Sequence, residues 1–416
     1  MLRRARLSKG SGLGIGDLGE LDDGRRQGVL RGWVWRTLRV ERPHRRHSPL
    51  RRRPRRAGGH RGRAFATVCE DDDMPRPLDQ LPKAHLHLHF TGSMRLSTLA
   101  ELAATEGLRL PHALVDEWPP RLTSVESRGW FRFQRLYDAA RACVRSLEAM
   151  RRIVREAALD DASEGSRWLE IQVDPTSYAP FCGGLTPALE LVLESATAAA
   201  AESGIGVGVV VAASRIRHPM DARTLARLAA RYAGEGTGAV VGFGLSNDEH
   251  RGAVEDFAPA FGIARGAGLA LVPHGGELVG PEAVIRTLDA LLPDRIGHGV
   301  RAAEDPRVLE RLAREGVALE VCPGSNVALG VYDAPPAVPL RTLLGAGIQV
   351  ALGADDPLLF GTRLVDQYRA AREVHGLDDE ALAGLARMSL RASTAPRDVV
   401  ARAEEDIDVW LAQPDG

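Results

Sequence analysis

Short apolar runs alternate with longer amphipathic stretches from residue 77 to the end of the chain. Several runs are continuously apolar, as strands buried on both faces of a sheet are. Strands that alternate with helices predict a parallel sheet, and eight of them predict a closed (β/α)8 barrel, the TIM-barrel fold of the α/β class. The runs are Ala84–Leu88, Trp168–Val173, Gly206–Ala212, Ala239–Gly244, Leu269–Pro273, Arg295–Gly297, Val317–Val321 and Ile348–Leu352.

The first two runs are separated by about 80 residues with a mostly helical pattern. One crossover helix needs far fewer residues, so we expect a helical insertion after strand 1 that lies over the mouth of the barrel. Residues 377–411 also follow a helical pattern, and we expect them to close the domain.

Residues 1–75 are rich in Arg, Gly and Pro and differ from the rest of the chain. Residues 1–63 carry 19 Lys and Arg against 5 Asp and Glu, a balance of +14, which leaves −15 for the remainder. Such a segment cannot bury enough apolar surface to offset the entropy that it would lose on ordering. We therefore predict a basic, disordered extension over 1–75 and a barrel domain over 76–416. Two alternatives are a basic arm for nucleic acid, and upstream sequence translated ahead of a start at Met74.

The composition excludes several classes of protein. A hydrophobic content of 44% with 26% charged residues fits a globular domain, and the lack of a run of about 18 apolar residues predicts no membrane span. The acidic body disfavours a nucleic-acid-binding surface on it. The four cysteines form no CxxC pair and the basic start has no apolar stretch after it, so we expect reduced thiols and a cytoplasmic protein.

Alternating histidines, His85, His87 and His89, lie in the first run and directly after it. Side chains alternate along a strand with a period of two, so this spacing predicts three imidazoles on one face. A single histidine is more often a core residue, but three at the end of a strand favour a metal site.

Further polar groups follow three later runs: His274-Gly275-Gly276-Glu277, Gly297-His298-Gly299 and Asp355-Asp356-Pro357. Taken singly, a histidine beside glycine is compatible with a turn, and Asp-Asp-Pro with the N-cap of a helix. All of them come just after a predicted barrel strand, however, and barrel enzymes build their active sites at the carboxyl ends of the strands.

This set of motifs resembles the adenosine deaminase family of the amidohydrolase superfamily. The family pattern is H-x-H on strand 1, H-x-G-E after strand 5, G-H-G after strand 6 and D-D-P after strand 8. The resemblance runs from about Leu81 to Leu411, and Val241–Gly244 with Asp248-Glu249 is similar to the family's strand 4 segment.

The resemblance implies a role for each of these residues. One Zn²⁺ per subunit would be bound by His87, His89, His274 and Asp355, and would activate a water that attacks C6 of the purine ring. The resemblance assigns Glu277 as the general acid that protonates N1, and His298 as the group that orients the water. Asp356 would hydrogen-bond N7. His85 stands where the family has Glu, so we interpret it as structural, with a His85/His87 metal pair as the alternative.

Three departures from the family pattern bear on the substrate. Thr91 stands where animal-type adenosine deaminases have an Asp that holds the ribose 5′-hydroxyl, and Asn247 stands where they have a Gly that meets N3. Asp174 after strand 2 has no counterpart that we can assign. We therefore expect a small-molecule purine nucleoside, adenosine, as substrate, with a 5′-modified adenosine, 6-amino-6-deoxyfutalosine, as the alternative.

The role of the segment Arg128–Arg135 stays open. It places aromatic side chains beside guanidinium groups, which suits an aryl carboxylate, but an amphipathic helix with its arginines in water has the same pattern.

Other classes of protein fit the sequence less well. The zinc deaminases with H-x-E and P-C-x-x-C are excluded, because Cys322-Pro323 lacks the second cysteine, and we expect Cys322 in the core. Another metal hydrolase, which would often carry a lysine after strand 4, or a binding protein acting through the basic extension, is less favoured.

Overall fold

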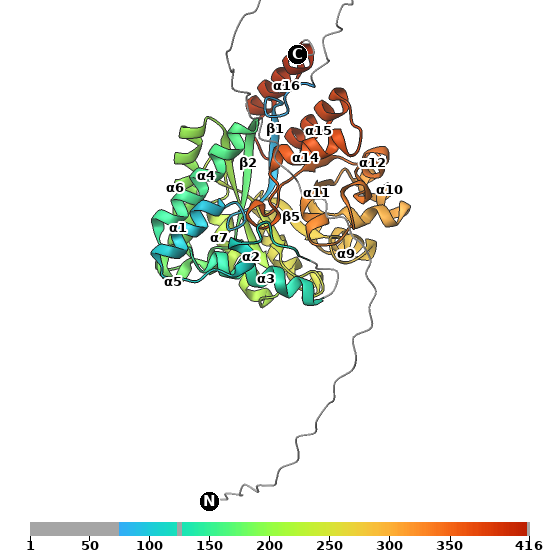
Figure 1. Ribbon diagram of the computed structural model, residues 1–416. Coiled ribbons are helices and arrows are strands. Elements are labelled where there is room, and N and C mark those ends of the chain that lie inside the picture. The colour runs from blue at the N-terminus through green and yellow to red at the C-terminus, as the bar shows by residue number, and fades with distance from the viewer. Residues whose placement is uncertain (1–74, 123–126, 414–416) are drawn as a thin grey trace, which may run out of the picture. The chain divides into compact units, whose positions relative to one another are not determined.

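A computed structural model describes residues 75–122 and 127–413 of the chain. Eight strands form one parallel sheet in chain order, with helices around it (Figure 1), which confirms the predicted (β/α)8 barrel. Each predicted apolar run overlaps one strand. The strands are β1 (Lys83–His89), β2 (Ser166–Val173), β3 (Gly206–Ser214), β4 (Val240–Ser246), β5 (Ala270–Gly275), β6 (Arg295–His298), β7 (Ala318–Val321) and β8 (Val350–Leu352).

The strands form where β-branched and small apolar residues are consecutive. In β3, with the sequence GVGVVVAAS, seven of the nine residues are buried. Valine is stiff at χ1 and packs well on a pleated surface, and a strand that lies between a barrel interior and a layer of helices has no polar face. This explains why the runs lack the alternation of a half-exposed strand.

The sheet closes between β1 and the residues that follow β8. The backbone N–H of His89 donates to the carbonyl oxygen of Asp355 at 3.0 Å, and the N–H of Asp355 donates to the carbonyl oxygen of His87 at 3.0 Å. Helix α15 (Asp379–Ala392) packs against both β1 and β8. Barrel closure therefore places the backbone of Asp355 beside the two histidines.

Helices connect successive strands. Those between β2 and β8 are α5 (Ala179–Cys182), α6 (Leu185–Ser203), α7 (Pro219–Arg231), α8 (Ala258–Gly266), α9 (Pro281–Leu291), α10 (Pro306–Glu315), α11 (Pro323–Ala328) and α12 (Leu340–Gly345). Short 3-10 turns are η1 (Pro175–Ser177), η2 (Val254–Phe257), η3 (Val300–Glu304) and η4 (Pro335–Ala337). After β8 come α13 (Pro357–Phe360), α14 (Leu364–Glu373), α15 and α16 (Arg397–Ala412), so the expected helical end is observed.

The predicted helical insertion follows β1. It contains α1 (Leu96–Thr105), α2 (His112–Val115), α3 (Ser127–Arg141) and α4 (Leu147–Ser163). The indole Nε1 of Trp118 donates to the carbonyl oxygen of Leu358 at 2.7 Å, and the ring of Phe133 stacks on that of Phe360 with centroids 5.7 Å apart. These contacts hold the insertion against the segment that follows Asp356, at the carboxyl ends of the strands.

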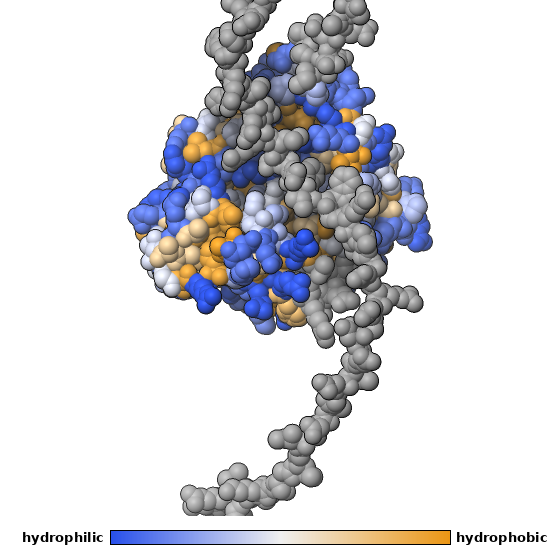
Figure 2. All heavy atoms as spheres, in the orientation of Figure 1, coloured by the Kyte–Doolittle hydropathy of each residue, from blue (hydrophilic) through white to orange (hydrophobic). Residues whose placement is uncertain are grey.

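The described surface in the view of Figure 2 is mainly hydrophilic, with smaller apolar patches. Within residues 75–122 and 127–413, the structure has no helix with both the length and the apolar character needed to cross a membrane. The predicted disordered extension, residues 1–75, lies outside the described residues except for Pro75.

Candidate metal centre and active site

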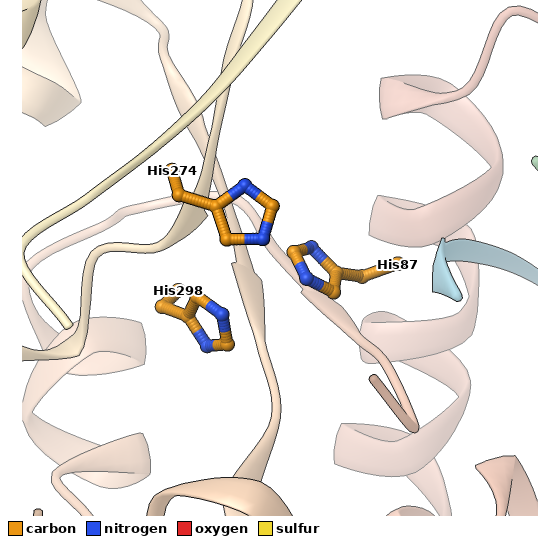
Figure 3. Close-up of side chains that lie close together, drawn as sticks. All are labelled: His87, His274 and His298. Atoms are coloured by element: carbon orange, nitrogen blue, oxygen red, sulfur yellow. The ribbon is translucent and has the colours of Figure 1, made fainter. Parts of the chain in front are cut away.

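Four strand ends bring the predicted site residues to one place. His87 and His89 lie at the end of β1, His274 in β5, His298 at the end of β6, and Asp355 after β8. Figure 3 shows the imidazole rings of His87, His274 and His298 turned toward one another. The arrangement follows from the barrel, because its parallel strands all end at the same mouth.

The distances between the predicted ligand atoms fit one ion. The Nε2 atom of His89 lies 3.2 Å from that of His274 and 3.3 Å from Oδ1 of Asp355, and the Nε2 atom of His87 lies 3.6 Å from the same oxygen. Ligand atoms about 2.0–2.1 Å from a tetrahedral zinc ion are roughly 3.3 Å from each other. These three spacings match neighbouring ligands of one zinc ion. The predicted set of four is nevertheless not one of the compact groups in the described residues: His87 and His274 lie within 4.8 Å of His298, whereas Asp355 lies within 4.8 Å of His87 and Cys322, or of His89 and Asp356.

The other ring nitrogen of His87 explains its orientation. Its Nδ1 atom donates to Oε2 of Glu320 at 2.7 Å, which leaves Nε2 for a metal, and among the described residues this buried Nε2 has no hydrogen-bond partner. Burial lowers the pKa of His87, but the neighbouring carboxylates of Asp355 and Glu320 outweigh it and raise the pKa from 6.5 to about 10. A carboxylate on the far nitrogen is a usual support of a histidine ligand.

Asp355 is also held by a second side chain. The hydroxyl of Ser325 donates to its Oδ2 atom at 2.6 Å, so Oδ1 is the oxygen that faces His87 and His89. Burial raises the pKa of Asp355, but the favourable interactions with His87 and His89 outweigh it, and the pKa falls well below its usual value. The carboxylate is therefore ionised, as a metal ligand must be.

The support of His87 continues through the barrel interior. Arg295 Nε donates to Glu320 at 2.6 Å, and its Nη2 atom donates to Glu170. All three side chains are almost fully buried. Sequence reasoning missed this chain of charges, although each member is a charged residue inside a run predicted to be a buried strand. Such residues need partners, since an unpaired buried charge is costly.

His85 does not join the metal cluster. Its Nδ1 atom is 3.0 Å from a carboxylate oxygen of Asp161, and its Nε2 atom accepts the backbone N–H of Ala354 at 3.0 Å. The pairing register of β1 against β2 shifts between His85 and Leu88, so the strict alternation that would place three imidazoles on one face does not hold there. His85 thus anchors the residue before Asp355, as expected of a structural group.

Glu277 and His298 lie beside the predicted ligands. The Nε2 atom of His298 is 3.6 Å from Oε1 of Glu277 and 3.9 Å from Oδ2 of Asp355. Burial raises the pKa of Glu277 well above its usual value, and the charges of Asp355 and Glu249 add to the rise. Burial lowers the pKa of His298 to about 3. The site thus holds a carboxyl group that keeps its proton and a neutral imidazole.

Asp356 is buried next to these groups. Burial, followed by the charge of Asp355, raises its pKa well above its usual value. A Cβ atom on Gly92 would lie 1.7 Å from the Oδ1 atom of Asp356, so only glycine allows the chain after β1 to approach this carboxyl. The structure therefore provides a second carboxyl group that can donate a hydrogen bond.

Three of the predicted residues have a left-handed backbone. The φ angles are 84° for Asn247, 63° for His298 and 62° for Asp355. Such values are uncommon for residues other than glycine and cluster at active sites, where the surrounding structure holds them in place. The side-chain Oδ1 of Asn247 accepts the N–H of Asp248 at 2.8 Å, so its side chain is engaged locally.

A cavity opens beside His89. Its empty space of about 320 Å³ includes space that is open to solvent. Thr91 is buried, and its hydroxyl lies 2.6 Å from the hydroxyl of Tyr178, which itself lines the cavity. The lining residues are His89, Phe90, Tyr137, Arg141, Gln172, Asp174, Ser177, Tyr178, Ala212 and Ser246.

The arginines of the segment Arg128–Arg135 that the structure describes face solvent. Arg132 and Arg135 are exposed, while Trp130 and Phe133 of the same helix are buried, which is the pattern of an amphipathic helix. The side chain of Arg128 lies outside the described residues. Arg141, at the end of α3 and beyond that segment, lines the cavity instead.

Cys322 and Asp174 also lie closer to the site than their sequence context indicated. Cys322 is buried as expected, but its thiol lies within 4.8 Å of ligand atoms of His87 and Asp355, and burial raises its pKa well above the usual value. Asp174 lines the cavity and caps η1 by accepting the N–H of Thr176 at 3.0 Å. No motif pointed to this position for Cys322, whereas Asp174 stood out in the sequence because it follows the second predicted strand.

Comparison with known proteins gives a consistent family. The model of the adenosine deaminase family matches residues 82–410. A putative adenosine/adenine deaminase from Streptomyces virginiae is 62% identical over 81% of this chain and 98% of its own length. An aminodeoxyfutalosine deaminase from Streptomyces coelicolor is 34% identical over 82% of this chain and 88% of its own length.

A solved structure shares the fold across the same region. The crystal structure of an adenine deaminase from Arthrobacter aurescens is 28% identical, with a TM-score of 0.73, and the match covers 80% of this chain and 99% of that one. The family match over residues 82–410 includes every residue of the candidate site.

Proposed function

The chain belongs to the adenosine deaminase family and is an enzyme of that type, and we propose that it hydrolyses the C6–amino bond of an adenine ring held against a zinc site. The observation that carries the proposal is the cluster at the barrel mouth, where Oδ1 of Asp355 lies 3.6 Å from Nε2 of His87 and 3.3 Å from Nε2 of His89, and Nε2 of His274 lies 3.2 Å from that of His89. The carboxyl of Glu277, whose pKa burial raises well above its usual value, lies beside this cluster.

The donor set favours zinc among the divalent ions. Imidazole nitrogens with one carboxylate suit zinc, whereas magnesium and calcium prefer oxygen ligands. When bound, the ion would lower the pKa of a water so that hydroxide is available near neutral pH. The residues that would hold it are His87, His89, His274 and Asp355.

The two buried carboxyl groups suit the two ring nitrogens on either side of C6. Glu277 holds a proton that it gives to N1, which makes C6 more electrophilic. Asp356 also keeps its proton, so its O–H donates to N7, which is an acceptor. His298, a neutral imidazole 3.6 Å from Glu277, orients the water that attacks C6. Water adds at C6 and ammonia leaves, so adenine becomes hypoxanthine, or adenosine becomes inosine.

We infer that the free base is accepted at least as well as the nucleoside. The hydroxyl of Thr91, at the position that resembles the family's 5′-hydroxyl acceptor, is already bonded to Tyr178. A site without that acceptor loses the discrimination that a buried polar partner provides. The neighbouring solved structure is of an adenine deaminase, which agrees with this assignment.

A second substrate is favoured by one observation. Arg141 lines the cavity, with its guanidinium 2.6 Å from Asp138 and 5.9 Å from the centroid of the Tyr137 ring. A guanidinium there would recognise a carboxylate at the end of a 5′ extension, as in 6-amino-6-deoxyfutalosine. Arg132 and Arg135 do not contribute, since they face solvent.

Ammonia release by the zinc-loaded protein tests the proposal. The substrates are adenine, adenosine, 2′-deoxyadenosine and 6-amino-6-deoxyfutalosine, each assayed before and after removal of the metal by a chelator. We expect release from adenine with a kcat/KM that equals or exceeds that for adenosine, and loss of release on chelation. Lack of release from all four compounds would contradict the proposed function, and a preference for the futalosine derivative would select the second substrate.

A further inference from the structure

Glu249 receives four consecutive backbone N–H groups from the loop that carries Glu277. Its Oε1 atom accepts the N–H of Gly276 at 2.5 Å, and its Oε2 atom accepts those of Glu277 at 3.0 Å, Leu278 at 2.7 Å and Val279 at 2.9 Å. Glu249 lies after β4 and the loop lies after β5, so one carboxylate from a neighbouring strand end holds the whole turn.

The carbonyl groups of the same loop are held by two arginines. The Nη2 atom of Arg215, after β3, donates to the carbonyl oxygen of His274 at 2.6 Å, and Nη1 of Arg301 donates to that of Leu278 at 2.6 Å. The N–H of Arg301 also donates to the carbonyl oxygen of Gly276 at 3.0 Å. The loop is therefore held both through its carbonyl groups and through its N–H groups. Within the described residues, Glu249 is the only side chain that accepts hydrogen bonds from the N–H groups of residues 276–279.

The loop needs such a support because of its sequence. Gly275 and Gly276 precede Glu277, and Gly276 has a φ of 69°. Glycine has more conformational freedom than any other residue, so a Gly-Gly pair does not by itself fix the direction of the following side chain. Four N–H groups without an acceptor in a partly buried turn would also be unfavourable. One carboxylate satisfies both requirements.

We propose that Glu249 is a positioning residue for Glu277: by binding the N–H groups of residues 276–279, it holds the Glu277 carboxyl beside His298 and Asp355, where the purine N1 must arrive. This inference rests on the proposed function, because it takes Glu277 as the proton donor. Glu249 touches the backbone of the loop and not the metal ligands' side chains, so its effect falls on the chemical step and not on metal binding.

The Glu249→Gln variant tests this assignment. A glutamine has one acceptor oxygen, so whichever way its amide turns, its NH2 group faces at least one backbone N–H. We expect kcat to fall about 10-fold to 100-fold, as displacements near 1 Å at a catalytic group do, with KM and zinc affinity little changed. Hydrogen exchange of a peptide that spans residues 276–279 should become faster.

A matched control is Glu255→Gln. Glu255 lies in η2 near the same mouth and forms an exposed ion pair with Arg286 at 2.7 Å, so its loss should leave kcat and the exchange of residues 276–279 unchanged. If Glu249→Gln fails to fold, Glu249→Asp keeps the charge on a side chain one methylene shorter and is measured in its place.

The outcomes separate this inference from the proposed function. Unchanged exchange at residues 276–279 in Glu249→Gln overturns the role of Glu249 whether or not the protein is a deaminase. A fall in zinc affinity that accounts for the fall in kcat also overturns it, because Glu249 would then act through His274. Absence of ammonia release by the wild-type protein refutes the proposed function, and the exchange result still reports on the loop.

Discussion

The chemistry of single residues in this site depends on what lies behind them. His87 presents one nitrogen to the metal position because Glu320 binds the other at 2.7 Å. Glu320 in turn stays ionised beside the guanidinium of Arg295, which also pairs with Glu170. A paired buried charge is stable where an isolated one is not, so these residues fix the orientation and charge of a ligand without touching the metal.

Replacement of Glu320 by glutamine should weaken zinc binding. The amide keeps the shape of the carboxylate but removes its charge, so the Nδ1–H of His87 has a weaker acceptor and the imidazole becomes a poorer ligand. We expect zinc affinity at fixed pH to fall about 10-fold to 100-fold, measured by competition with a chromophoric chelator.

Glu315→Gln is the matched control for this prediction, because Glu315 is a partly exposed carboxylate at the end of the preceding helix, α10. Its zinc affinity should equal that of the wild-type protein. Equal affinity in Glu320→Gln would show that the carboxylate does not tune the ligand.

The residues with metal-ligand spacing were visible in the sequence, and their supports were not. His87 lies near the end of an apolar run, His274 comes directly after one and Asp355 follows one by three positions, so their place at the barrel mouth follows from the strand prediction. The partner of His87 is separated from it by 233 positions, and nothing in the chain around Glu320 indicates which histidine it meets. Pairing across a barrel depends on register, which short apolar runs do not determine.

At the scale of elements, strand β6 approaches the metal position closely enough to restrict its own sequence. A Cβ atom on Gly297 would lie 2.8 Å from Cε1 of His87 and 3.2 Å from Nδ1 of His274. Two imidazoles therefore pack on the backbone of β6, and the ligands from β1 and β5 can converge only if this position has no side chain.

Gly297→Ala should displace those two ligands. The first contact is shorter than carbon atoms normally allow, and a ring held by Glu320 has little freedom to move away. We expect the bound zinc per chain, measured by elemental analysis after dialysis, to fall well below that of the wild-type protein.

Gly262→Ala provides the comparison, because Gly262 lies in helix α8 and a Cβ atom there meets nothing within 4 Å. This variant should keep its zinc and gain stability of up to about 1 kcal/mol from helix propensity. Full zinc content in Gly297→Ala would mean that the rings have room that the packing does not indicate.

The sequence predicted the positions of the strands well, because hydrophobicity determines them. It predicted the direction of the side chains less well where the strand pairing is irregular. All eight strands agree with the apolar runs, because a buried parallel strand needs little besides such a run. The alternating histidines of β1 predicted three imidazoles on one face. The pairing register shifts after His85, however, and the His85 ring contacts Asp161 and the backbone of Ala354 instead. Bulges have weak sequence signals, so this outcome required the structure.

At the scale of the whole molecule, the residues before β1 form hydrogen bonds and an ion pair with the last two helices, α15 and α16. Arg76 Nη1 lies 2.7 Å from Oδ2 of Asp379, and the indole of Trp410 donates to the carbonyl oxygen of Pro77 at 3.0 Å. The buried ammonium of Lys83 donates to the carbonyl oxygen of Leu78 at 2.9 Å. Residues 76–78 therefore pack with the last helices, and we propose residue 76 as the start of the barrel domain.

Two truncated chains test where the functional domain begins. A chain that starts at Met74 retains all three of these contacts and all residues of the family match, 82–410. Its kcat/KM for adenine should stay within about two-fold of the full chain, with a Tm within about 2 °C, since no interaction described for residues 75–122 and 127–413 is lost.

A chain that starts at Leu81 loses the contacts of Arg76, Pro77 and Leu78, and leaves the Lys83 ammonium with fewer acceptors. An unsatisfied buried donor costs about 1–3 kcal/mol, so its Tm should fall by several degrees. Thermal unfolding followed by circular dichroism, with ammonia release on the same samples, measures both. Loss of activity in the chain from Met74 would assign residues 1–73 a part in the enzyme, and equal Tm values for the two chains would show that the ties at residues 76–78 do not stabilise the barrel.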